Sequence, residues 1–119
     1  MKENTIKYKS FKFAIRIVKL YQFLVGEKRE YVLSKQLLRS GTSVGAMVRE
    51  AEHSESKADF IHKMAIAQKE INESIYWLEL LKETEYLSNE QYESINKDAI
   101  EVIKMLTSII KTTKTNLRK

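Results

Sequence analysis

Apolar residues recur three and four positions apart along most of this chain, and this spacing constrains the fold more than any other feature. The clearest case is residues 92–109, where the apolar positions alternate three and four apart without a gap. Such a repeat places them in one stripe along an α-helix that packs in a bundle. The 119 residues include no proline and only three glycines, so few residues interrupt a helix. The sequence therefore predicts an all-α fold.

Four helices separated by short polar breaks account for the pattern. Two of the breaks are followed by the spacing of a capping box, in which a serine precedes an acidic or amide side chain by three residues. These boxes are Ser56 with Asp59 and Ser88 with Gln91. Connections this short imply antiparallel neighbours, so residues 1–119 are expected to form a single domain, an antiparallel up-and-down four-helix bundle. We expect the helices at about residues 5–25, 31–52 and 57–84, with the fourth running from about 89 nearly to the C-terminus.

Two of the three glycines, Gly41 and Gly45, lie inside the second predicted helix. Glycine in a helix interior costs about 0.5–1 kcal/mol relative to alanine, so this pair needs a structural reason. Residues four apart share a helix face, and a face without Cβ atoms lets a neighbouring backbone approach closely. We therefore predict that both glycines lie at a close helix crossing.

The first predicted helix carries two apolar stripes. One includes Phe11, Ile15 and Val18, and the second is centred about 130° away at 100° per residue. One interpretation is a single wide core stripe with a few exposed apolar residues. The other is that the second stripe, with two residues of the third helix, is buried against other subunits. This interpretation assigns the oligomer interface to Phe13, Ile17, Leu20, Leu24, Trp77 and Leu81.

The net charge of +5 is distributed unevenly along the chain. Residues 1–29 carry eight Lys or Arg and two acids, whereas residues 30–87 are mildly acidic. The last segment, 88–119, is again basic. Because both chain ends lie at the same end of an up-and-down bundle of four helices, we expect one electropositive end.

Four cations of the first predicted helix are spaced three, four and three apart, which places them on one face. Together with the basic C-terminal tail they form a surface suited to phosphate backbones, where affinity comes from counterion release. The alternative is an ordinary solvated face whose charge only keeps the protein soluble. The predicted nucleic-acid-binding residues are Lys9, Lys12, Arg16, Lys19, Lys111, Lys114, Arg118 and Lys119.

Sites for catalysis or metal binding find little support in the sequence. The chain has no cysteine, which excludes disulfides and thiolate ligands. Glu50 and His53 have the carboxylate-x-x-His spacing of di-iron bundles, as do Asp59 and His62. All four lie outside the core-facing stripes, whereas a di-iron site projects inward. The hydroxyl residues beside Gly41 lack a nearby histidine base, and the Gly-Lys-Ser/Thr ending of a phosphate-binding loop is absent. We expect no catalytic residue, no metal and no cofactor.

The central half of the chain closely resembles one bacterial family. The resemblance rests on the runs QLLRSGTSVGA (36–46), REA (49–51) and YWLELL (76–81), together with Ser56, Asp59, Phe60, Lys63, Ala67, Lys69 and Glu70. The family comprises four-helix-bundle proteins encoded in intervening sequences of 23S ribosomal RNA genes, also labelled S23 ribosomal proteins. The one departure is Met-Val at residues 47–48, where the family often has Asn-Ile.

The resemblance implies an antiparallel four-helix bundle that assembles into a ring-shaped homopentamer. The family is similar to the accessory variability determinant of diversity-generating retroelements, a basic pentamer that binds nucleic acid and a reverse transcriptase. We therefore expect a non-enzymatic homo-oligomeric module that binds RNA or DNA, with a reverse transcriptase or another protein as a further partner. The alternative is a protein–protein interaction scaffold with no nucleic-acid role. No apolar run approaches the length of a membrane span, and residues 1–4 do not open a signal peptide, so we expect a cytoplasmic protein.

Overall fold

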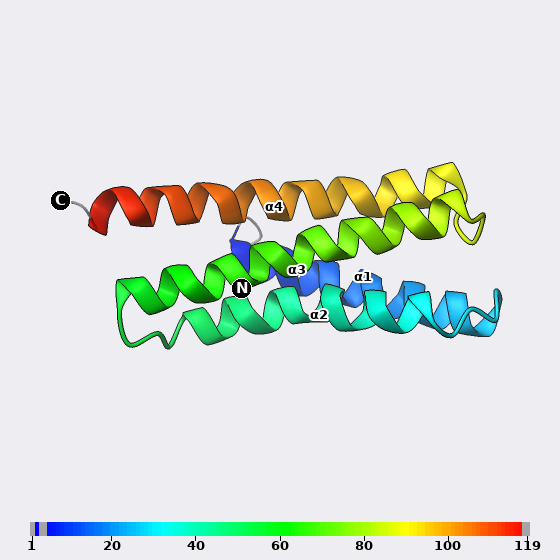
Figure 1. Cartoon of the computed structure of the whole chain (residues 1–119), viewed down its shortest axis with the longest axis horizontal. Helices are drawn as coiled ribbons and strands as arrows, with labels where there is room; N and C mark the ends of the chain where they lie inside the picture. Colours follow the sequence, from blue (N-terminus) through cyan, green and yellow to red (C-terminus); the bar gives the residue numbers. More distant parts are fainter. Residues whose placement is uncertain (1, 3–4, 118–119) are drawn as a thin grey trace.

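The computed structural model, which describes residue 2 and residues 5–117, consists of helices joined by short turns (Figure 1). The predicted all-α fold is confirmed, and the helix ends that we expected at numbered positions lie within two residues of the observed ones. The boxes at Ser56 and Ser88 cap the third and fourth helices as predicted, through hydrogen bonds of 3.0 and 3.1 Å to the serine hydroxyls. The helices are α1 (Ile6–Gly26), α2 (Leu33–Ala51), α3 (Lys57–Glu83) and α4 (Asn89–Leu117).

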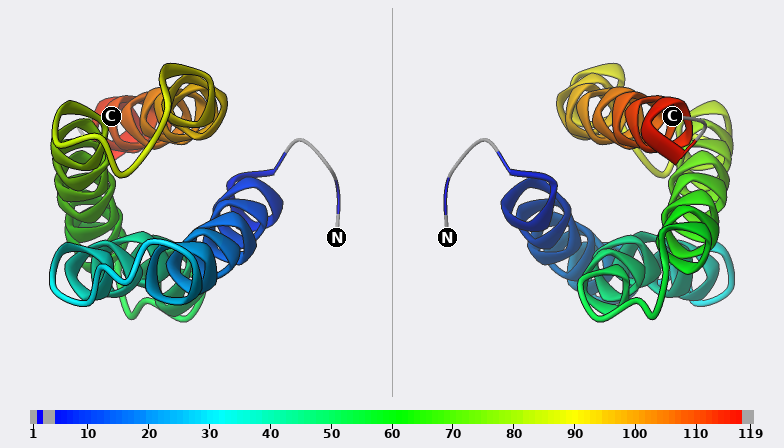
Figure 2. Two further views of the ribbon diagram at one scale, coloured as in Figure 1. Left: turned by 90° about the vertical axis from the view of Figure 1, so that its right-hand side faces the viewer. Right: turned by 90° about the vertical axis from the view of Figure 1, so that its left-hand side faces the viewer.

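Successive helices run antiparallel, and the four form an elongated bundle of 51 × 24 × 21 Å (Figure 1). Viewed along its length, the bundle shows α1, α2, α3 and α4 following one another around an arc (Figure 2). The contact between α1 and α4, which closes the arc, is the loosest of the four helix contacts. This seam between the first and last helices positions the candidate site.

The core is lined by the stripes of apolar residues that recur three and four positions apart on α2, α3 and α4. Each stripe contributes fully buried side chains to one cluster, because a period of three and four keeps these residues on the inner face. The most enclosed members from these helices are Leu37, Val44, Ile71, Leu78, Val102 and Leu106.

The assignment of the two stripes of α1 was wrong. Phe13, Ile17 and Leu24 are no more than 1% exposed and pack inside the chain, as does Leu81 of α3. These four residues therefore cannot form a surface between subunits. Leu20 and Trp77 are only partly buried. The periodicity locates both stripes but does not fix the rotation of the helix about its axis.

The first stripe of α1 is instead the exposed one. Phe11, Ile15 and Val18 remain 44%, 42% and 38% exposed. The guanidinium carbon of Arg49 in α2 lies 5.0 Å from the centre of the Phe11 ring, so a cation borders the stripe. We call Phe11, Ile15 and Val18 the outer stripe of α1.

The two glycines of α2 lie where this helix meets α1. A Cβ atom on Gly41 would stand 2.7 Å from Cγ1 of Ile17, which is too close for two carbon atoms. At Gly45 the nearest atom would be the backbone oxygen of Ser10 at 3.4 Å, a tight but ordinary approach. The absent side chain at Gly41 thus makes room for a core isoleucine, and Gly45 brings the α1 backbone close.

The start of α2 is capped by Glu30, which the sequence analysis did not identify. Its carboxylate accepts hydrogen bonds from the backbone N–H groups of Val32, Leu33 and Ser34, at 3.2, 3.0 and 2.6 Å. Burial opposes the charge of Glu30, but these backbone donors outweigh it and hold the pKa of the carboxyl below its ordinary value. The preceding Arg29 adopts a positive φ of 55°, which turns the chain into this cap.

Candidate nucleic-acid interface

Two of the four cations predicted to form a basic face on α1 pair with acids of α4. Lys9 Nζ lies 2.7 Å from Glu101 Oε1, and this carboxylate raises the pKa of Lys9. Arg16 Nη1 lies 2.7 Å from Asp98 Oδ2, and the guanidinium also donates to the backbone and side-chain oxygens of Ser94 at 3.1 and 2.9 Å. Both pairs hold α1 against α4 along the loosest seam of the bundle.

The other two cations of that face, Lys12 and Lys19, are exposed. Within residues 5–117, neither is within ion-pair distance of an acid. Lys12 follows Lys9 by three positions, and Lys19 follows Arg16 by three. Because Lys9 and Arg16 pair with acids of α4, both lysines lie on the side of α1 that is next to α4. Of the four cations on this face of α1, Lys12 and Lys19 are therefore the two that can contact a ligand without first breaking an ion pair among the described residues.

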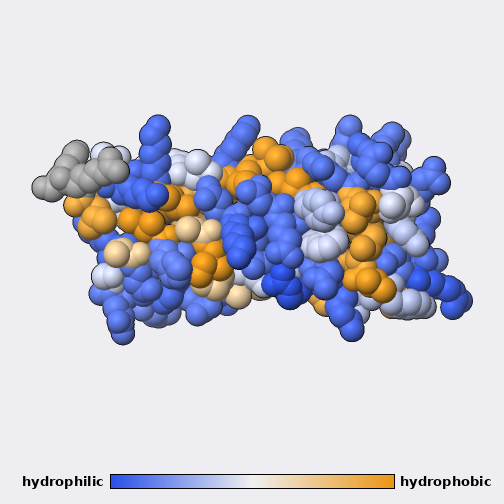
Figure 3. All heavy atoms as spheres, in the orientation of Figure 1, coloured by the Kyte–Doolittle hydropathy of each residue, from blue (hydrophilic) through white to orange (hydrophobic). Residues whose placement is uncertain are grey.

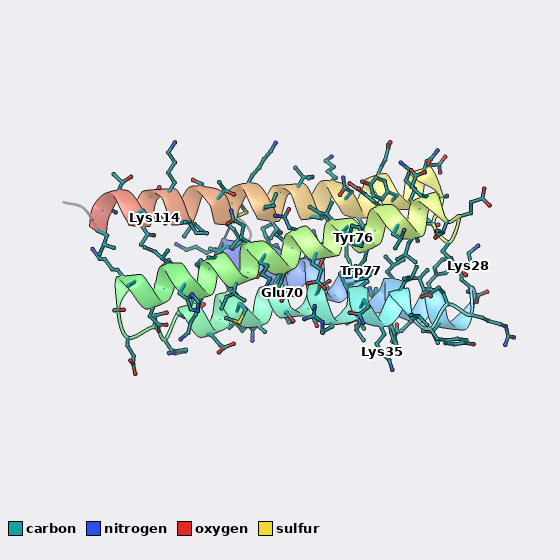
Figure 4. The ribbon with its side chains drawn as sticks, viewed as in Figure 1. Lys28, Lys35, Glu70, Tyr76, Trp77 and Lys114 are labelled. Atoms are coloured by element: carbon teal, nitrogen blue, oxygen red, sulfur yellow. The ribbon has the colours of Figure 1, made fainter. Side chains whose placement is uncertain are left out.

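The fourth helix contributes exposed lysines that the sequence analysis only partly identified. Lys97, Lys104 and Lys111 follow one another at intervals of seven, close to two helical turns, so they share one side of α4. This spacing could have identified Lys97 and Lys104 from the sequence, but our predicted nucleic-acid-binding residues did not include them. Lys114 projects near the C-terminal end of α4 (Figure 4). In the described part of the chain, none of these four lysines has an ion-pair partner.

One of the lysines of α4, Lys104, adjoins the start of α1. Thr5 and Ile6 line a hollow together with Lys104, so this lysine lies beside the first turn of α1. Lys7 is less available, since its ammonium lies 3.2 Å from the Glu52 carboxylate. The predicted residues Arg118 and Lys119 lie outside the described residues. We define the α1–α4 basic face as Lys12, Lys19, Lys97, Lys104, Lys111 and Lys114.

A pocket opens between α1 and α4 beside this face. Its volume is about 480 Å³, and it lies where α1 ends and α4 begins. The apolar walls are Leu20, Phe23 and Ile95, and they make up most of the lining. Its polar residues are Arg16, Lys19, Glu90, Gln91 and Ser94.

The α2–α3 side of the bundle has a different character. Apolar side chains form separate clusters there, divided by hydrophilic ones (Figure 3). Tyr76 is 57% exposed and packs edge-on against Trp77, with ring centres 5.1 Å apart (Figure 4). Arg39 of α2 donates to Glu73 at 2.7 Å and lowers the pKa of that carboxyl. Glu70 lies 3.5 Å from the same guanidinium. The cations on this side are thus partly balanced by acids.

The residues with di-iron spacing do not come together as a metal site. Glu50, His53 and His62 are exposed, and Asp59 binds Lys63 at 3.1 Å. Among residues 2 and 5–117, no group of three His, Cys, Asp or Glu side chains is placed to hold a metal ion. No helix in the same residues has the length and apolarity to span a membrane.

Comparisons with known proteins give one family. Its sequence model, described as 23S rRNA-intervening sequence protein, matches residues 2–108. A crystal structure of a protein with unknown function, from the S23 ribosomal protein family of Bacteroides thetaiotaomicron VPI-5482, shares 63% of its sequence with this chain. The match covers 90% of this chain and 99% of the other, with a TM-score of 0.89. A search of curated proteins gives no match. The chain therefore belongs to the 23S rRNA-intervening sequence protein family.

Proposed function

We propose that this protein is a non-enzymatic, homo-oligomeric module that binds the phosphate backbone of RNA or DNA through its α1–α4 basic face. The observation that carries the proposal is the set of six exposed lysines along two adjacent helices, none of them paired with an acid in the described residues. Unpaired ammonium groups can release the counterions of a polyanion without first losing a bond within the protein. Backbone contacts of this kind carry little sequence information.

The distribution of acids supports the same face. From residue 102 to residue 117, α4 carries three lysines and no Asp or Glu. A polyanion approaching this half of the helix meets no like charge on α4 itself. On α2 and α3, by contrast, Arg39 is already paired with two glutamates. The C-terminal half of α4 thus carries lysines and no acids, whereas the cation Arg39 on α2 is already neutralised.

Self-association is the second part of the proposal, and it rests on the outer stripe of α1. Three large apolar side chains, 38–44% exposed and on one helix face, form a surface that a second subunit can cover. A closed ring would repeat the basic face in every subunit and raise the avidity for a long polyanion. The family resemblance favours a pentamer for this ring.

A protein–protein scaffold is the alternative, and one observation favours it. The exposed Tyr76 packed on Trp77, with Arg39 close by, has the residue types that dominate binding hot spots in protein interfaces. Under this alternative the aromatic patch binds a partner protein, a reverse transcriptase by family analogy, and the lysines only keep the protein in solution.

Charge reversal separates the two functions. The test variant changes Lys12, Lys19, Lys104 and Lys111 to Glu, and the control changes the α2–α3 residues Lys35 and Lys69 to Glu. Fluorescence anisotropy with labelled duplex DNA and structured RNA should show binding by wild type and the control, and none by the test variant. Equal binding by all three proteins would remove the basic face from the proposal. Sedimentation should give the same mass for all three, since none of these changes touches the outer stripe.

A further inference from the structure

The pocket between α1 and α4 differs in composition from the basic face beside it. Most of its lining is apolar, and at about 480 Å³ its volume falls in the range of small-molecule sites. Cations also surround it. Lys19 and Arg16 line it, and Lys28 lies 5.9 Å from the ring centre of its wall residue Phe23. An apolar pocket bordered by cations fits a ligand with a flat, weakly polar body and an anionic backbone.

We propose that this pocket holds an unpaired nucleotide, with the base between the apolar walls and the flanking phosphates on the neighbouring lysines. The inference rests on the proposed function, and it makes the preferred ligand a single strand or a strand with unpaired bases. Phe23 supplies an aromatic wall, and stacking of bases on aromatic side chains is tolerant of sequence. A base paired within a duplex is stacked on its neighbours and cannot enter.

Hydrogen-bonding groups in the pocket match the edge of a base. Gln91 accepts a hydrogen bond from the Ser88 backbone N–H through its side-chain oxygen, which leaves its NH₂ group to donate. Ser94 accepts from Arg16, and its own O–H can still donate. The Glu90 carboxylate supplies an acceptor. One acceptor and two donors can therefore meet the mixed donors and acceptors of a base edge.

The pocket is continuous with the basic face. Lys19 belongs to both, and Lys97 follows the pocket residue Ser94 by one helical turn on α4. Lys28 is placed at the end of the bundle where α4 begins (Figure 4). A strand whose base occupies the pocket can thus continue along the basic face in one direction and reach Lys28 in the other.

The test compares three labelled ligands at one salt concentration. They are a short single-stranded RNA, the same RNA annealed into a duplex, and an abasic strand of equal length. Wild type should bind the single strand about tenfold more tightly than the abasic strand, the effect of stacking roughly one base. Equal affinity for the two would overturn the pocket while leaving backbone binding intact. Failure to bind any of the three would overturn both proposals.

Two variants locate the effect. Ser94→Phe places a large side chain in the pocket from an exposed position, so the fold is at little risk. It should remove the preference for the single strand and keep the affinity for the abasic strand. Ser108→Phe, a matched change at another exposed serine of α4, should behave as wild type. Loss of the preference in both variants would contradict the assignment. The assignment would also be contradicted if Ser94→Phe kept the preference for the single strand and had a smaller sedimenting mass than wild type. That result would show that the pocket is covered by a second subunit.

Discussion

Two ion pairs between α1 and α4 neutralise Lys9 and Arg16, so under the proposed function removing the acids should strengthen DNA binding. The change is Asp98→Asn with Glu101→Gln, which keeps the shape of both side chains and leaves two cations beside Lys12 unneutralised. If both then contact phosphates, the slope of log affinity against log salt should steepen by about 1.8, at about 0.9 per contact. Between 50 and 200 mM salt, this corresponds to about a tenfold larger loss of affinity than in wild type.

The assay is anisotropy of labelled duplex DNA at several salt concentrations. The variant should bind more tightly than wild type at the lowest salt and lose its advantage as salt rises. Both pairs are partly exposed, with side chains 26–45% accessible, so their removal should destabilise the fold only slightly. Thermal melting checks that the fold is retained.

A matched control separates the position of the charge from its amount. Glu70→Gln with Glu73→Gln also neutralises two acids that pair across helices, but it frees Arg39 on the α2–α3 side. The slope should change little in this control. The reasoning is refuted if the control steepens the slope as much as the α1–α4 variant, because net charge alone would then explain binding.

Further perturbations test the packing, the α2 cap and the outer stripe. Gly41→Ala should cost about 1–3 kcal/mol, because its Cβ overlaps the buried Ile17, whereas Gly45→Ala should be nearly neutral; urea unfolding of both variants tests this contrast. The folded-state pKa of Glu30 is depressed, so its stabilisation is complete above the ordinary carboxyl pKa and is lost as pH falls through the folded value. Glu30→Gln should therefore flatten the acid limb of stability against pH, and an unchanged limb would contradict the capping role. Ile15→Asp should reduce the sedimenting mass to that of a monomer, and an unchanged mass would remove the outer stripe from the interface.

Much of the fold could be predicted because it depends on local patterns. The three-and-four spacing located all the helices, and the serine boxes located the starts of two of them. The cap on α2 was missed because Glu30 precedes the helix by three residues and binds its N–H groups from outside the usual capping position. Its recognition needs the turn geometry at Arg29, which no sequence pattern encodes.

The candidate site was harder to predict because it depends on which helices meet. Sequence spacing placed Lys9 and Arg16 on one face of α1, but it could not show that Glu101 and Asp98 of α4 lie opposite them. The rotation of α1 that buries Phe13 and exposes Phe11 also depends on how α1 packs against its neighbours. The pocket beside Phe23 likewise depends on residues more than sixty positions apart in the chain.

Whether the free lysines of the α1–α4 face bind phosphate backbones can be measured from the salt dependence of duplex DNA binding by the wild-type protein. Binding should persist at physiological salt, and the slope of log affinity against log salt should be about −5 if all six lysines of one subunit contact phosphates. Absence of binding even at low salt would contradict the account and leave the aromatic patch at Tyr76 and Trp77 as the surface to pursue.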